Sequence, residues 1–311
     1  MSNIFDALNK GGGEMAEIIL PLMDAQNEPA PRTDEPRSPV VVGPPLLVSA
    51  HKRPDVLPVV SSPPASELLP ERVRTLSLRI AAPSPLLPFE DSHWQASEQY
   101  RILRTKISQH PKQPRLLVIS SPSAGDGKSV SAVNIAGALS LKSEAKVLLV
   151  DADFRRSTVH RQLGLPAAPG LTDVLRGACT MEQALVHTQE FSNLYVMSAG
   201  TPPVNPVELL DSAQWPALCA RFRSLFRYVV VDSPPLAAVA DYDLIQAVCD
   251  GIILVVRPDR TSRQMCRKAL ETVSKAKFLG VVMNCVPDWF LARHASPQYY
   301  YYSGPESPRS K

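Results

Sequence analysis

The segment 121–129 (Ser-Pro-Ser-Ala-Gly-Asp-Gly-Lys-Ser) has the composition of a phosphate-binding loop. Gly125 and Gly127 allow backbone amides to approach a phosphate group, and a helix that begins here adds partial positive charge. Lys128 is then placed to reach the β- and γ-phosphates of a nucleotide, and the hydroxyl of Ser129 to hold Mg²⁺. The strict pattern has glycine where Pro122 stands, yet a strand before the loop and a helix after it favour nucleotide binding over a glycine turn. The predicted nucleotide contacts are Ala124, Gly125, Asp126, Gly127, Lys128, Ser129 and Val130.

Carboxylates follow two other apolar runs of the chain. Asp151 and Asp153 stand two residues apart, where they can hold one cation together, or one can hold metal while the other accepts a proton. Asp232 follows the run Tyr-Val-Val-Val, an arrangement in which the carboxylate binds Mg²⁺ directly or through water. Aspartates at strand ends also cap helices, so the functional interpretation depends on the neighbouring phosphate-binding loop.

Runs of Val, Ile and Leu alternate with helical patterns and predict a mainly parallel α/β sheet with helices on both faces. Ligands of such sheets bind at the carboxyl ends of the strands, so the loop, the aspartates and Asn284 are expected at one edge. Asn284 carries donors and acceptors that suit an adenine edge, and a turn-forming asparagine is the alternative. Strands are predicted at 116–120, 147–150, 194–198, 228–231, 252–256 and 280–283, and helices at 94–109, from the loop to about 141, and at 206–226.

Composition divides the 311 residues into a leader, one globular domain and a tail. Of the 31 prolines, 15 lie in residues 1–88, together with a single aromatic residue. Such a segment cannot bury enough apolar surface to offset its ordering entropy, so we expect a mostly disordered Pro-rich leader. Residues 2–9 form either a short amphipathic helix or a frayed terminus. Order is expected to begin near Phe89, with a nucleotide-binding domain at 89–290 and a flexible tail at 291–311.

Several classes of protein are disfavoured by simple counts. No apolar run reaches the roughly 18 residues that a membrane helix needs. The five cysteines stand singly, which argues against a disulfide scaffold or a metal cluster. A net charge of +3 is too small to indicate nucleic acid as a partner. The chain is therefore interpreted as cytoplasmic.

Together these motifs resemble those of the bacterial tyrosine kinases (BY-kinases), which have the P-loop fold of the MinD/ParA-like superfamily. The Walker A loop is joined by the family's DxDxR motif at Asp151, Asp153 and Arg155, and by its hhhDxPP Walker B motif at Asp232. Residues 198–210 resemble the family's GxxPPNPxELL segment. Residues 94–105 resemble its ExxRxxR oligomerisation helix, with the motif carried by Glu98, Arg101 and Arg104.

The resemblance covers about residues 90–302. The cytoplasmic members linked to exopolysaccharide or capsule biosynthesis fit best, because no counterpart of the membrane-spanning half fused in other members is seen.

The resemblance implies ATP and Mg²⁺ as cofactors and an autokinase as the activity. Catalytic roles would fall to Lys128, Asp151, Asp153 and Asp232, and the metal would be held by Ser129, Asp151 and Asp232. The acceptors would be four consecutive tyrosines, modified in trans within a ring-like homo-oligomer: Tyr299, Tyr300, Tyr301 and Tyr302. The implied partners are a membrane regulator of polysaccharide chain length, which would activate the kinase and recruit it to the inner face of the membrane, and a cognate tyrosine phosphatase.

Two other functions share part of this pattern. A MinD/ParA-like ATPase would use the same loop and transfer phosphate only to water. Its signature lysine would stand at position 123, where this chain has serine, and it leaves the tyrosine run unexplained. An inactive scaffold for the polysaccharide machinery is the third possibility, and the complete set of Lys128, Asp151, Asp153 and Asp232 argues against it.

Overall fold

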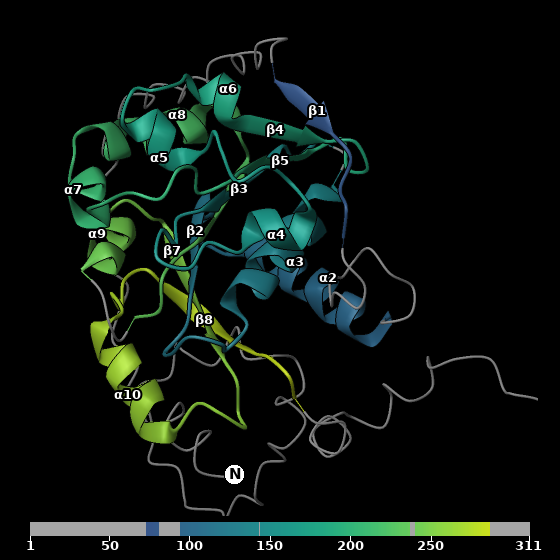
Figure 1. Ribbon diagram of the computed structural model, residues 1–311. Helices are drawn as coiled ribbons and strands as arrows, with labels where there is room; N and C mark the ends of the chain where they lie inside the picture. The colour runs from purple at the N-terminus through teal and green to yellow at the C-terminus, as the bar shows by residue number, and fades with distance from the viewer. Residues whose placement is uncertain (1–72, 81–93, 143, 237–239, 287–311) are drawn as a thin grey trace, which may run out of the picture.

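The computed structural model describes residues 73–80 and 94–286, apart from 143 and 237–239. These residues form one eight-stranded sheet with helices packed on both of its faces (Figure 1). The strand order is β1-β4-β5-β3-β6-β2-β7-β8, and every neighbouring pair is parallel except β4 with β5. The strands are β1 (Arg74–Leu76), β2 (Leu116–Ser120), β3 (Val147–Asp151), β4 (Leu185–Thr188), β5 (Leu194–Met197), β6 (Tyr228–Asp232), β7 (Gly251–Val256) and β8 (Phe278–Met283).

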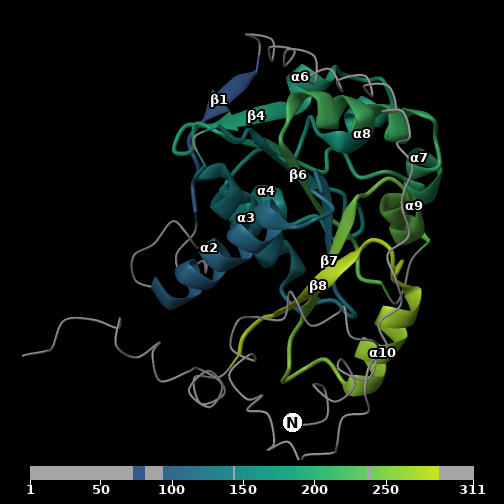
Figure 2. The ribbon, with the colours of Figure 1, turned by 180° about the vertical axis from the view of Figure 1, so that it is seen from behind.

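The central strands are buried on both faces, as their continuous apolar runs predict. Alternate residues of each strand enter two separate cores. In β2, Leu116 and Val118 pack into one core, whereas Leu117 and Ile119 pack into the other. The sheet therefore forms the middle of three layers, and Figure 2 shows the same arrangement from behind.

Each core is completed by its own set of helices. The core around Leu117 is covered by α2 (Trp94–Gln109), α3 (Lys128–Ser140) and α4 (Val159–Leu163). The opposite core is covered mainly by α5 (Leu171–Leu175), α6 (Met181–Ala184), α8 (Gln214–Leu225), α9 (Asp241–Ala247) and α10 (Arg263–Thr272). The predicted mainly parallel sheet with helices on both faces is thus confirmed.

The helix predicted over 206–226 is divided into α7 (Pro206–Leu210) and α8. The side chain of Ser212 donates a hydrogen bond to the carbonyl of Leu209 at 2.6 Å. Short polar side chains compete in this way with the helical hydrogen-bond ladder. The prediction of a single helix was wrong at this point.

Two strands lie outside the sequence prediction. β4 has only four residues and pairs antiparallel with β5. β1 lies within the segment predicted to be leader, so the expected start of order near Phe89 is corrected. Residues 71–82 contain no proline, and Leu76, Leu78 and Ile80 alternate so that they pack against the core under α3. The average composition of residues 1–88 concealed this short alternating stretch.

The helix considered for residues 2–9 and the tyrosine run 299–302 lie outside the described residues. Within residues 73–80 and 94–286, no helix combines the length and the apolar character required to cross a bilayer.

Candidate active site

The phosphate-binding loop joins β2 to α3, and its two glycines have positive φ angles. Gly125 and Gly127 have φ angles of 90° and 92°, in the left-handed region that side chains disfavour. A Cβ atom on Gly127 would also lie 1.9 Å from the side-chain Nδ2 atom of Asn284. Lys128 is the first residue of α3, so the helix N-terminus opens directly onto the loop.

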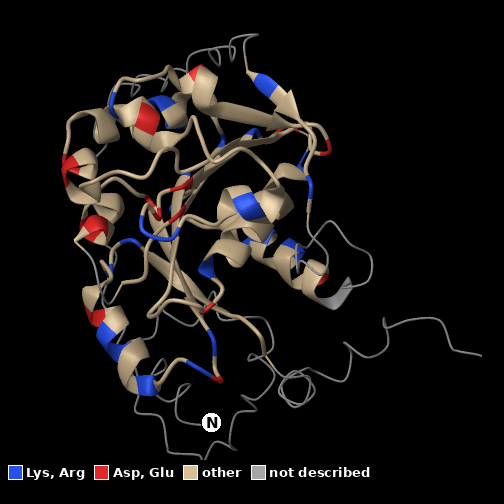
Figure 3. Ribbon diagram, in the orientation of Figure 1, with Lys and Arg blue, Asp and Glu red and all other residues tan. Residues whose placement is uncertain are grey.

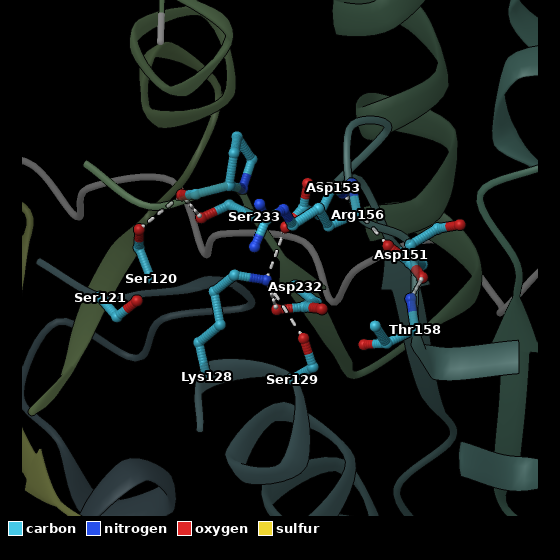
Figure 4. A network of polar contacts seen from close by, with 12 residues as sticks. Ser120, Ser121, Lys128, Ser129, Asp151, Asp153, Arg156, Thr158, Asp232 and Ser233 are labelled. Carbon is cyan, nitrogen blue, oxygen red and sulfur yellow. Dashed lines mark hydrogen bonds and ion pairs between the residues drawn. The ribbon is translucent and has the colours of Figure 1, made fainter. Parts of the chain in front are cut away.

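Lys128 lies between the carboxylate of Asp232, at the end of β6, and that of Asp153, in the loop after β3 (Figure 4). Its Nζ atom is 2.7 Å from Oδ2 of Asp153 and 3.3 Å from Oδ1 of Asp232, and it donates to the hydroxyl of Ser129 at 3.1 Å. Burial alone would lower the pKa of Lys128, but the charges of Asp232 and Asp153 outweigh it, so the pKa is raised. The lysine is therefore charged and neutralises buried carboxylates.

Asp151 and Asp232 are direct neighbours across β3 and β6. Burial and the charge of Asp232 raise the pKa of Asp151 to about 8. Burial also raises the pKa of Asp232, against the opposing effect of Lys128. Two buried acids at adjacent strand ends thus disfavour each other's ionised form. A cation bound beside them would favour the ionised form of both.

The two carboxylates of the DxDxR segment make different contacts. Asp151 accepts backbone hydrogen bonds from Asp153, Thr158 and Val159, at 3.1–3.2 Å, and so fixes the loop that leads into α4. Asp153 accepts one from the amide of Arg156 at 3.0 Å and turns its other oxygen to Lys128. Asp151 therefore shapes the segment, whereas Asp153 faces the lysine of the loop.

The arrangement of donors fits Mg²⁺ bound mainly through a nucleotide. Oδ2 of Asp232 is buried and has no hydrogen-bond partner among the described residues, and the hydroxyl of Ser129 lies nearby. No group of three or more His, Cys, Asp or Glu residues in the described part is arranged to hold a metal ion by itself. Mg²⁺ commonly keeps several waters and is held by one or two carboxylates together with phosphate oxygens.

Asn284 reaches the phosphate-binding loop from the end of β8. Its Nδ2 atom donates to the carbonyl of Asp126 at 3.0 Å, and its backbone amide donates to Val256 at 2.8 Å. The structure brings Asn284 to the same strand-end edge as Lys128, Asp151, Asp153 and Asp232, as predicted. Its interpretation as an adenine contact stays a prediction.

Sequence reasoning missed two contacts around this edge. Arg155 forms a two-pronged ion pair with Asp241 at the start of α9, with N···O distances of 3.0 and 3.2 Å. Thr261, in the loop after β7, donates to the carboxylate of Asp126 at 2.9 Å. Neither Asp241 nor Thr261 belongs to a motif, and the contacts join segments 86 and 135 residues apart, so no local pattern signals them.

The residues predicted to mediate assembly lie away from this edge, on α2. Glu98 and Arg101 form an exposed ion pair at 3.3 Å. Leu103 and Ile107 of the same helix pack into the core, and Arg104 is half-buried. The structure thus presents Glu98 and Arg101 at the surface, and their role in assembly stays a prediction.

The sheet order, the loop and the strand-end acids together define a P-loop nucleotide-binding domain. Residues 113–306 match a family model described as ParA, NUBPL iron-transfer P-loop NTPase. The tyrosine-protein kinase YwqD of Bacillus subtilis (strain 168) is 38% identical over 208 residues, which span 66% of this chain and 86% of that protein. The tyrosine-protein kinase CpsD of Streptococcus agalactiae is 32% identical over 62% of this chain and 84% of its own length.

A solved structure is similar over the same part of the chain. The crystal structure of the chimerical protein CapA2B2 superposes with a TM-score of 0.62 at 29% identity, covering 69% of this chain and 94% of that one. The chain belongs to the bacterial tyrosine kinase family, within the ParA-type P-loop NTPases.

Proposed function

We propose that this protein is an ATP- and Mg²⁺-dependent protein-tyrosine kinase that phosphorylates its own C-terminal tyrosines. The observation that carries the proposal is the convergence of Lys128, Asp153 and Asp232 at the mouth of a phosphate-binding loop. The similarity to proteins named tyrosine-protein kinases supports it. Phosphoryl transfer depends on positioning and charge neutralisation more than on covalent chemistry, and this edge supplies both.

The residues of the loop would bind and orient the nucleotide. The backbone amides of residues 124–130 cradle the phosphates, and Lys128 exchanges its carboxylate partners for the β- and γ-phosphates. Ser129 and Asp232 hold Mg²⁺, with Asp151 beside them. When bound, Mg²⁺ neutralises charge on the phosphate oxygens. Asn284, which contacts the loop at Asp126, would contact the adenine base.

The contacts favour Asp153 as the acceptor of the tyrosine proton. Its Oδ2 atom is held by Lys128 and becomes free when the lysine turns to phosphate. Asp151 is bound by three backbone amides and is better suited to stay in place beside the metal. Proton transfer by a positioned carboxylate is a recognised contribution to such reactions.

The acceptors, the assembly and the partners belong to the same proposal. Tyr299, Tyr300, Tyr301 and Tyr302 are phosphorylated in trans within a ring-like homo-oligomer formed through Glu98, Arg101 and Arg104. The kinase works in the cytoplasm, at the inner face of the membrane. There a membrane regulator of exopolysaccharide or capsule chain length activates it, and a cognate phosphatase reverses it. The family resemblance and the tyrosine run support these roles.

Labelled ATP tests the proposal directly. The purified full chain is incubated with γ-labelled ATP and Mg²⁺, and phosphotyrosine and free phosphate are measured together. Tyrosine label that disappears in Lys128→Met is the expected result, because the lysine's charge is needed on the transferred phosphate. Free phosphate without tyrosine label would instead identify a MinD/ParA-like ATPase, and neither product would indicate a scaffold. Thermal unfolding of Lys128→Met checks that the variant is folded.

A further inference from the structure

Arg260 lies against the phosphate-binding loop, although no motif includes it. A Cβ atom placed on Gly125 would lie 2.9 Å from Nη1 of Arg260 and 3.4 Å from its Cζ atom. The guanidinium group therefore packs directly on the backbone of Gly125. Arg260 is exposed, and its side chain forms no hydrogen bond or ion pair with any other described residue.

The loop that carries Arg260 is anchored to the phosphate-binding loop by a buried hydrogen bond. Thr261 Oγ1 donates to Asp126 at 2.9 Å and accepts from the amide of Arg257 at 3.2 Å. Asp126 in turn accepts from the amide and hydroxyl of Ser123, at 3.0–3.2 Å. Asp126 and Thr261 are almost completely buried. The position of Arg260 over Gly125 is thus built into two joined loops.

Arg257, in the same loop, already has a partner. Its guanidinium forms two hydrogen bonds with the carboxylate of Asp259, at 2.9 and 3.1 Å. Arg260 makes no such two-pronged contact among the described residues. Its charge helps Arg257 to lower the pKa of Asp259, but its donors stay available to a ligand. A guanidinium presents several donors in a planar fork that matches phosphate oxygens.

Lys128 already has partners when no phosphate is bound. It is shared between Asp153 and Asp232, at the edge where Asp151 also lies. A bound triphosphate adds further negative charge. Position 123 of the loop, where MinD/ParA-like ATPases have a lysine, is serine in this chain.

We propose that Arg260 is a second phosphate-binding cation, which contacts the phosphates of a bound nucleotide from the Gly125 side of the loop. It acts opposite Lys128, which approaches from the side of Asp153 and Asp232. The inference rests on the proposed nucleotide-binding function. It adds to that function a binding residue from outside the family motifs, and a positioning role for Thr261.

Calorimetric titration of the full chain with Mg²⁺ and each of ATP, ADP and inorganic tripolyphosphate tests the proposal. Arg260→Gln is expected to weaken all three by about 10-fold or more, the loss typical of a charge-assisted hydrogen bond. Arg263→Gln is the matched control, because it removes the same charge from an exposed position at the start of α10. Figure 3 shows the basic residues of that helix in blue. The Arg263→Gln variant is expected to bind within about 2-fold of wild type, since lone exposed charges contribute little.

The ligands and a second pair of variants make the outcome decisive. Thr261→Val removes the bond to Asp126 and is expected to weaken binding, whereas Thr261→Ser keeps the hydroxyl and the affinity. An Arg260→Gln variant that binds all three ligands like wild type overturns the proposal. An Arg260→Gln variant that loses affinity for ATP but not for tripolyphosphate also overturns the proposal, because the guanidinium then contacts base or ribose. A wild-type chain that binds none of the ligands overturns the proposed function itself, and the inference with it.

Discussion

At the scale of single residues, Lys128 is the centre of the charge balance of the site. Without nucleotide it neutralises Asp153 and Asp232, which are almost completely buried. Buried carboxylates without a cation are costly, so the lysine keeps the strand ends compatible with folding. Under the proposed function Lys128 would turn to phosphate, and Asp232 would then hold Mg²⁺ in place of the lysine.

Replacement of Asp153 by Asn tests the division of labour between the two aspartates. We expect Asp153→Asn to lower tyrosine phosphorylation by about 100-fold or more, the contribution of a positioned base. Its affinity for Mg²⁺–ATP should stay close to wild type, because the proposed phosphate and metal contacts of Lys128, Ser129 and Asp232 are unchanged. Single-turnover phosphorylation and calorimetric titration measure the two effects. If Asp153→Asn transfers phosphate at the wild-type rate, the acceptor of the proton is a different group.

At the scale of elements, Asp250 fastens the starts of β2 and β7 to α8. Its carboxylate accepts hydrogen bonds from the backbone amides of Arg115 and Leu116, at 3.1 and 2.8 Å, and forms an ion pair with the guanidinium of Arg223 at 2.8 Å. Burial alone would raise the pKa of Asp250, but the hydrogen bonds from Arg223 and the backbone amides outweigh it, so the pKa falls below 3.8. The folded state therefore favours the ionised carboxylate.

This linkage predicts a pH-dependent loss of stability. Because the pKa of Asp250 is lowered on folding, its contribution is present above pH 3.8 and is lost as pH falls through the folded value. Asp250→Asn should lower the free energy of unfolding at pH 7 by about 1 kcal/mol, a modest value because the pair is partly exposed. Urea unfolding of both proteins from pH 7 to pH 3 is the measurement. The difference should shrink below about pH 4, and a constant difference would contradict the linkage.

The same elements show why sequence patterns predict some parts of the fold and not others. β2, β3, β6 and β7 are continuous apolar runs because helices cover both faces, and such runs are visible without any partner. β1 and β4 have three and four residues, and their identity as strands depends on pairing with each other and with β5. That pairing is a tertiary property.

Some features of the candidate site can likewise be predicted from the sequence, and others cannot. The acids at strand ends and the glycine loop are local patterns, and parallel topology alone brings them to one edge. The ion pair of Arg155 with Asp241 and the packing of Arg260 on Gly125 join segments distant in the chain. Their residue types are common on any surface, so only the folded structure distinguishes them.

At the scale of the whole molecule, assembly through α2 is the first prediction. Glu98 and Arg101 are exposed on that helix, although their core-facing neighbours are buried. Arg101→Ala combined with Arg104→Ala should yield monomers in light scattering under conditions where wild type assembles. Arg267→Ala with Lys268→Ala removes the same charge from α10 and should leave assembly unchanged. An intact oligomer in the α2 variant would exclude this helix as the interface.

The last prediction concerns the direction of phosphoryl transfer to the tail. Fourteen residue steps separate Cys285 from Tyr299, and at about 3.3–3.6 Å each an extended chain spans at most roughly 46–50 Å. If subunits assemble as proposed, this length is sufficient for the tyrosines of one subunit to reach the site of a neighbour, and we predict transfer in trans. Each phosphate adds about −1.5 to −2 charges, and four modified neighbours repel one another and the acidic site, which favours disassembly.

To test the direction of transfer, a Lys128→Met protein with intact tyrosines is mixed with an active protein whose Tyr299–Tyr302 are all phenylalanine. Label is expected on the tail of the first protein, and light scattering should record smaller particles as wild type becomes labelled. An unlabelled Lys128→Met tail, at a concentration where wild type labels itself, would place transfer in cis.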